Sequence, residues 1–102
     1  MRSKVESYLG FAARARSLST GYNTCIFMME KRKLKLLILT EDLSENSKEK
    51  MLRAAKQYEV PCRTYGKMDD LSHITGTEGK GIFGLADKNL ADAIVSEIDR
   101  QS

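Results

Sequence analysis

The chain has 102 residues, of which 41% are hydrophobic and 30% are charged. This length and composition are typical of one globular domain over residues 1–102, and they exclude a disordered tail or a collagen-like repeat. No apolar run approaches the roughly 18 residues that span a bilayer, and no export signal is visible. We therefore expect a cytoplasmic protein that does not bind membranes. The 2 cysteines are too few for a disulfide framework or a zinc site.

Charge is distributed unevenly along the chain. Residues 1–40 contain eight Lys and Arg residues against Glu6 and Glu30, a balance of +6, whereas residues 41–102 have a balance of −3. A chain with one basic half can present a positive face to a polyanion such as RNA. The densest part of this half is the tract Lys31-Arg32-Lys33-Leu34-Lys35. Lys31, Lys33 and their neighbours either contact the polyanion or only solvate a loop.

The spacing of apolar residues predicts alternating helices and strands. In chain order we expect a helix over 3–16, a strand over 18–20, a helix over 21–31, a strand over 36–39, a helix over 46–58, a strand over 62–65, a helix over 69–76, a strand over 82–86 and a helix over 88–98. The run Leu36–Leu39 is continuously apolar, which is typical of a central strand buried on both faces. This order predicts a three-layer α/β/α sandwich with a mixed sheet of about four strands.

Capping signals predict where three of the helices begin. Ser19 or Thr20 can cap the second helix, and Asp87 can cap the last. Asn46 and Glu49 have the spacing of a capping box at the start of the third helix.

The motifs that could carry catalysis favour structural roles. Residues 79–84 match G-x-G-x-x-G, but the dinucleotide fingerprint needs a preceding strand and a helix that opens inside it, whereas this segment leads into a strand. Its glycines are expected to serve a turn and close packing, with a nucleotide-binding enzyme as the alternative. Cys25 and Cys62 are expected to be buried, and His73 to be a lone surface or capping imidazole. We expect no catalysis, no metal and no cofactor.

The segment Ser19–Thr24 is the best candidate for a binding site. It places unpaired backbone N–H groups, small hydroxyls and an amide at a helix N-terminus, which suits a phosphate. Asn23 can hydrogen-bond a base edge, or it only caps the helix. Tyr22 can stack on a base, or it only packs.

Several motifs occur in an order that resembles a known protein family. They are Gly21-Tyr22-Asn23 at a helix start, residues 34–42, Val60-Pro61, Tyr65-Gly66-Lys67, Asp70-Leu71, Gly76 and residues 82–85. Together they resemble the ribosomal protein L7Ae/L30e family of kink-turn RNA-binding proteins, and within it the bacterial YlxQ-type branch. The resemblance covers residues 3–98, and it implies an α/β/α sandwich that binds RNA through the start of the second helix and neighbouring loops.

The resemblance also implies roles for individual residues. Gly21, Asn23 and Thr24 match the positions that contact the sheared G·A pairs of a kink-turn. The loop formed by Gly66, Lys67 and Met68, continuing to Leu71, matches the segment that packs on bases flipped from the bulge. We accordingly expect a monomer whose partner is ribosomal or other structured RNA, in association with the ribosome.

Three positions depart from the family pattern. Thr24 stands where the family has an acidic residue, Phe27 where it has a lysine, and Ser72 where it has a glycine. Loss of a carboxylate and an ammonium aimed at base edges removes about 1–3 kcal/mol of discrimination each. The sequence therefore predicts RNA binding with the kink-turn as one candidate ligand. The alternative is a protein–protein interaction module on the same fold that has lost kink-turn specificity.

Overall fold

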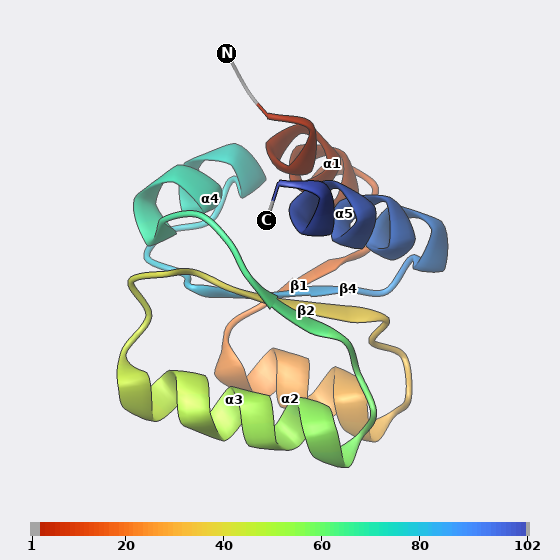
Figure 1. Ribbon diagram of the computed structural model, residues 1–102, viewed down its shortest axis with the longest axis vertical. Helices are drawn as coiled ribbons and strands as arrows, with labels where there is room; N and C mark the ends of the chain where they lie inside the picture. The colour runs from red at the N-terminus through yellow and green to blue at the C-terminus, as the bar shows by residue number, and fades with distance from the viewer. Residues whose placement is uncertain (1–2, 102) are drawn as a thin grey trace.

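The computed structural model describes residues 3–101, in which five helices cover the two faces of a four-stranded sheet (Figure 1). The expected α/β/α order is confirmed. In chain order the elements are α1 (Lys4–Arg14), β1 (Leu18–Thr20), α2 (Tyr22–Glu30), β2 (Leu36–Leu39), α3 (Glu45–Gln57), β3 (Cys62–Thr64), α4 (Met68–Thr75), β4 (Ile82–Leu85) and α5 (Lys88–Arg100). No helix within residues 3–101 is long and apolar enough to cross a membrane.

The sheet is mixed, with the strand order β1-β4-β2-β3. β4 is antiparallel to both of its neighbours and β3 is parallel to β2, so β1, β2 and β3 run in one direction and β4 in the other. The sheet therefore has two distinct ends. The Gly21 end is where β1, β2 and β3 stop and β4 begins, at Thr20, Leu39, Thr64 and Ile82. The Lys35 end is where those three strands begin and β4 stops, at Leu18, Leu36, Cys62 and Leu85.

Helices α1, α4 and α5 cover one face of the sheet, and α2 and α3 cover the other (Figure 1). Because side chains alternate along a strand, Leu36 and Ile38 enter the core on one face while Leu37 and Leu39 enter the core on the other. All four are fully buried. The prediction that this strand is covered on both faces is confirmed.

Two of the three expected helix caps are wrong. Ser19 and Thr20 pair with Gly84 and Phe83 of β4, so they are part of the sheet, and Gly21 is the N-cap of α2. The cap of the third helix is Ser44 and not Asn46, two residues earlier than the expected capping box with Glu49, and its side chain accepts a hydrogen bond from the N–H of Ser47. The expected cap at Asp87 is confirmed, since its carboxylate accepts from the N–H of Leu90 at 3.0 Å.

Helices α1, α2 and α3 all stop at the Lys35 end, each just before a non-glycine residue with a positive φ. These residues are Arg16 (59°), Arg32 (58°) and Glu59 (57°). In each case the next N–H bonds back to a carbonyl in the last turn, as in a Schellman motif: Ser17 to Ala12, Lys33 to Met28 and Val60 to Ala55. Glycine is the usual residue at this position because it has no Cβ to strain the left-handed backbone.

Candidate nucleic-acid interface

The N-terminus of α2 is exposed at the Gly21 end. The Gly21 backbone has a φ of 89°, and its N–H donates to the carbonyl of Ile82 at 2.9 Å. The next three residues, Tyr22, Asn23 and Thr24, are exposed. Their N–H groups lie in the first turn, where a helix supplies no carbonyl partner. These groups are available to an acceptor from outside the protein, such as a phosphate oxygen.

The side chain of Asn23 is also placed for an outside ligand. Asn23 is the second residue of α2, and no side chain caps this helix. The alternative that Asn23 is the helix cap is therefore wrong. Its exposed amide can donate and accept at the same time.

The positive end of the α2 dipole is not compensated within the described chain. α1, α3 and α5 are capped by the side chains of Ser3, Ser44 and Asp87, and α4 has Asp69 and Asp70 in its first turn. α2 has neither a side-chain cap nor an acidic residue in its first turn. The partial positive charge of its N-terminus favours an anionic ligand at this position.

Lys80 adds a full positive charge beside the same turn. Its Nζ lies 3.6 Å from the position that a Cβ on Gly21 would occupy. The two residues are close because β1 and β4 are neighbours in the sheet. The sequence predicts only structural glycines in residues 79–84, and no local pattern indicates that Lys80 lies beside Gly21. The loop that carries Lys80 is anchored by Ser72, one of the three departures from the family pattern.

The loop Gly66–Met68 lies at the same end of the sheet. The N–H of Glu41 donates to the Gly66 carbonyl at 2.8 Å, and a Cβ on Gly81 would lie 2.9 Å from Cε of Met68. Lys67 is exposed, and its Nζ lies 3.3 Å from a carboxylate oxygen of Glu41. This loop therefore lies at the same end of the sheet as the first turn of α2, but it follows the opposite edge strand, and Glu41 balances the charge of Lys67.

Asp42 fixes the start of α4. Its Oδ1 accepts a hydrogen bond from the N–H of Met68 at 3.0 Å. Desolvation acts to raise the pKa of Asp42, but the Met68 N–H, together with Thr40 and Lys67, outweighs it and lowers the pKa below its usual value. The charged carboxylate thus substitutes for the side-chain cap that the N-cap residue of α4 does not supply.

Leu71 and Tyr22 occupy different environments. Leu71 is fully buried in the core on the α1 side, and its Cγ would lie 3.2 Å from a Cβ on Gly66. Leu71 therefore packs against Gly66 from the core side of the loop. Tyr22 is 42% exposed and lines a recess of about 300 Å³ between α2 and α3, together with Lys50 and Arg53.

Lys31 and Lys33 do not belong to this constellation. α2 begins at the Gly21 end, whereas both lysines follow its last residue. A helix rises about 1.5 Å per residue, so the 9 residues of α2 place them about 13 Å away, at the Lys35 end.

The glycines and His73 have the structural roles that the sequence predicts, whereas Cys25 is buried as expected and Cys62 is only partly buried. Gly79 has a φ of 61°, and a Cβ on Gly84 would lie 2.5 Å from Cδ1 of Leu34, so these glycines serve a turn and close packing. Burial raises the pKa of Cys25 to about 12. Burial also raises the pKa of Cys62 to about 11 despite the opposing charge of Arg63, so neither thiol is activated. His73 is exposed near the end of α4, and residues 3–101 contain no cluster of three potential metal ligands.

This chain is similar to known proteins in both sequence and fold. The family model of the ribosomal protein L7Ae/L30e/S12e/Gadd45 family matches residues 3–94. RNA-binding protein YlxQ of Enterococcus faecium is 32% identical over 90 residues, covering 88% of this chain and 86% of that protein. RNA-binding protein YlxQ of Bacillus subtilis (strain 168) is 30% identical over 91 residues, covering 89% of this chain and 91% of that protein.

Two solved structures share the fold. A Bacillus halodurans protein, described as having unknown function, superposes with a TM-score of 0.92 at 28% identity, over 96% of this chain and 99% of that one. The Giardia lamblia 15.5kD RNA binding protein superposes with a TM-score of 0.79 over 100% of this chain and 93% of that one, at 13% identity. The second likeness concerns the fold alone. The resemblance seen in the sequence motifs is confirmed, and the chain belongs to the ribosomal protein L7Ae/L30e/S12e/Gadd45 family.

Proposed function

We propose that this protein binds structured RNA through the first turn of α2 and the adjoining loops at the Gly21 end. The observation that carries the proposal is the exposed α2 N-terminus, which has neither a side-chain cap nor a carboxylate in its first turn. The names of its relatives in Enterococcus faecium and Bacillus subtilis, both RNA-binding proteins, support the same class of ligand.

Each group at this end has a distinct part in the proposed contact. The free N–H groups of the first turn and the ammonium of Lys80 bind phosphate oxygens, which positions the RNA without reading its sequence. Asn23 donates to and accepts from a base edge, which supplies the discrimination. The exposed part of Tyr22 stacks on an unpaired base.

The finer proposal is a kink-turn or a closely related RNA, bound in association with the ribosome. Thr24 and Phe27 are exposed on the outer side of α2, with Phe27 54% exposed. The Nζ of Lys31 lies 5.4 Å from the centre of the Phe27 ring, so a positive charge still lies close to the position where the family has its lysine. Thr24→Glu combined with Phe27→Lys restores the family pattern and should raise kink-turn affinity. If the double variant binds a kink-turn no better than wild type, the kink-turn is not the ligand.

Replacement of Asn23 tests the proposed site itself. Asn23→Ala should lower affinity for a kink-turn RNA by about 1–3 kcal/mol, the value of a good bidentate base contact. Asn89→Ala is a matched control, because Asn89 is also an exposed second residue of a helix but lies in α5 at the Lys35 end. Fluorescence anisotropy gives both affinities, and thermal midpoints show that the variants fold. Equal affinity for wild type and Asn23→Ala would contradict the proposed site.

A protein–protein contact is the second candidate function. The observation that favours it is exposed apolar surface on the same layer, with Phe27 54% and Leu52 50% exposed. A salt titration separates the two candidates, because counterion release makes RNA affinity fall steeply with salt whereas a mainly apolar contact is little affected.

A further inference from the structure

The charged side chains of this protein are sorted to opposite ends of the sheet. Six exposed cations lie at the Lys35 end and are here called the basic cluster: Arg14, Arg16, Lys31, Arg32, Lys33 and Lys35. The loops and helix starts at the Gly21 end carry four lysines and seven carboxylates, the latter being Glu6, Glu41, Asp42, Glu45, Asp69, Asp70 and Glu78. The end that offers Asn23 is therefore not the end that offers most of the positive charge.

The fold assembles the basic cluster from separate segments. The N–H of Lys35 donates to the carbonyl of Leu85 at 2.7 Å, and the N–H of Ala86 donates to the carbonyl of Ser17 at 3.0 Å. The start of β2, the end of β4 and the start of β1 therefore lie side by side. The arginines at the end of α1 thus join the tract between α2 and β2.

The cations of the basic cluster are not neutralised by ion pairs. Within residues 3–101 none of the six makes one, and at this end only Lys88 does, with Asp92 at 3.2 Å. Four carboxylates share this end: Glu30, Glu59, Asp87 and Asp92. Asp87 is occupied as the cap of α5. The cluster keeps an excess of positive charge that can neutralise phosphates.

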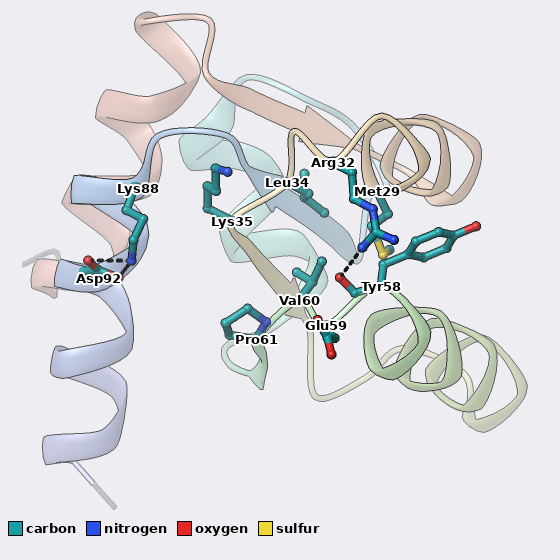
Figure 2. Close-up of a pocket in the computed structure, with 10 residues that line it drawn as sticks. All are labelled: Met29, Arg32, Leu34, Lys35, Tyr58, Glu59, Val60, Pro61, Lys88 and Asp92. Carbon is teal, nitrogen blue, oxygen red and sulfur yellow. Dashed lines mark hydrogen bonds and ion pairs between the residues drawn. The ribbon is translucent and has the colours of Figure 1, made fainter.

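A recess lies beside the basic cluster. It has a volume of about 380 Å³, with Leu34, Val60 and Pro61 forming an apolar floor. Figure 2 shows Lys35 and Lys88 on one side of this recess and Arg32 with Tyr58 on the other. The guanidinium of Arg32 lies 5.5 Å from the centre of the Tyr58 ring and donates to the Tyr58 carbonyl at 3.4 Å, which holds it at the rim.

We propose that the basic cluster is a second RNA-binding surface, which holds the phosphate backbone of a segment other than the one at Asn23. The proposal rests on the proposed function and extends it from one RNA contact to two. The 9 residues of α2 separate the two surfaces by about 13 Å. The protein thereby holds two segments of a folded RNA, reading bases at one end and phosphates at the other.

A blunt-ended RNA duplex without unpaired bases is the probe for this surface. Its affinity for wild type, Lys35→Glu and Glu59→Lys is measured over a series of salt concentrations. Loss of one phosphate contact lowers the slope of log affinity against log salt by about one. Lys35→Glu should therefore make the slope shallower by about one, and Glu59→Lys, which adds a cation beside the recess, should make it steeper. Glu49→Lys changes net charge equally on the exposed side of α3 and should leave the slope as in wild type.

Unchanged slopes in Lys35→Glu and Glu59→Lys, or an equal change in Glu49→Lys, would overturn the second surface. A membrane is the competing ligand. If wild type sediments with phosphatidylglycerol vesicles and Lys35→Glu does not, while the duplex slope is the same for both, the surface binds membranes and the proposal is overturned. The proposed function fails by a different result, namely unaltered kink-turn affinity in Asn23→Ala, so the two failures are distinguishable.

Discussion

Ser72 holds both backbone polar groups of Lys80 with a single hydroxyl. Its Oγ donates to the Lys80 carbonyl oxygen and accepts from the Lys80 N–H, each at 2.9 Å. Ser72 is only 4% exposed, so water does not readily replace these bonds. A glycine at this position, as in the family pattern, has no hydroxyl to make them. The departure therefore has a physical role, which is to fix the loop that brings the Lys80 ammonium next to Gly21.

Ser72→Ala should lower the free energy of unfolding by about 1–3 kcal/mol, because two hydrogen bonds worth about 0.5–1.5 kcal/mol each are lost. It should also weaken RNA binding, since the loop that carries Lys80 is no longer fixed. Urea denaturation and anisotropy measure the two effects. Ser96→Ala, at an exposed position on α5, should stay within about 0.5 kcal/mol of wild type. Equal stability of the two variants would show that the Ser72 bonds contribute nothing.

Arg32 and Glu59 allow backbone strain to be separated from charge. Both have a left-handed backbone, with φ values of 58° and 57°, and both lie at the Lys35 end. Replacement by glycine relieves the left-handed strain and should raise the free energy of unfolding by about 1 kcal/mol. In Arg32→Gly this gain is offset because the contacts with Tyr58 are lost. Glu59→Gly should therefore raise the thermal midpoint, and Arg32→Gly should raise it less or leave it level. The decisive contrast is in duplex RNA affinity, which should fall in Arg32→Gly and hold or rise in Glu59→Gly. A parallel fall in both would argue against an electrostatic role for Arg32.

The lowered pKa of Asp42 predicts a pH dependence of stability. A carboxyl whose pKa is lower in the folded state stabilises the fold at pH values above its unfolded pKa, and this contribution is lost as the pH falls through the folded pKa. The ordinary value for Asp42 is 3.8, so the loss should occur below that pH. Asp42→Asn should be less stable than wild type at pH 7, and the difference should shrink under acid. Thermal midpoints over a pH series test this, and a difference independent of pH would contradict it.

Gly84 should tolerate no larger residue. A Cβ at this position would lie 2.5 Å from Cδ1 of Leu34 and 3.2 Å from Sγ of Cys25, both buried between β4 and α2. Overpacking of this kind costs about 1–3 kcal/mol. Gly84→Ala should therefore lower the free energy of unfolding by about 1–3 kcal/mol in urea denaturation. An unchanged urea midpoint would show that Leu34 moves aside freely.

The order of elements could be predicted from the sequence because each element has a local signal. The unbroken apolar run of β2 indicates burial on both faces, and the stripe along α5 indicates one buried side. The start of α2 could not be predicted in the same way. Ser19 and Thr20 have the chemistry of helix caps, but their pairing with Gly84 and Phe83 is a contact between residues far apart in the sequence.

The candidate site could be predicted only in part for the same reason. Asn23 and its neighbours share one helical turn, so they could be identified together. Lys80 is close to Gly21 only because β4 lies beside β1, which no local pattern indicates. Lys31 and Lys33 are near Asn23 in sequence, yet the intervening helix carries them to the opposite end of the sheet.

The most direct test of RNA binding at the Gly21 end is an NMR titration of the isotopically labelled protein with a kink-turn RNA. The backbone amides of Tyr22, Asn23 and Thr24 should shift most, because they are the free donors at the α2 N-terminus, and Lys80 should shift with them. Added salt should release the amides around Lys33 and Lys35 first, because the contacts proposed there are to phosphates alone, whereas Asn23 also contacts a base edge. Shifts confined to other parts of the chain, with the first turn of α2 unaffected at saturation, would contradict the account.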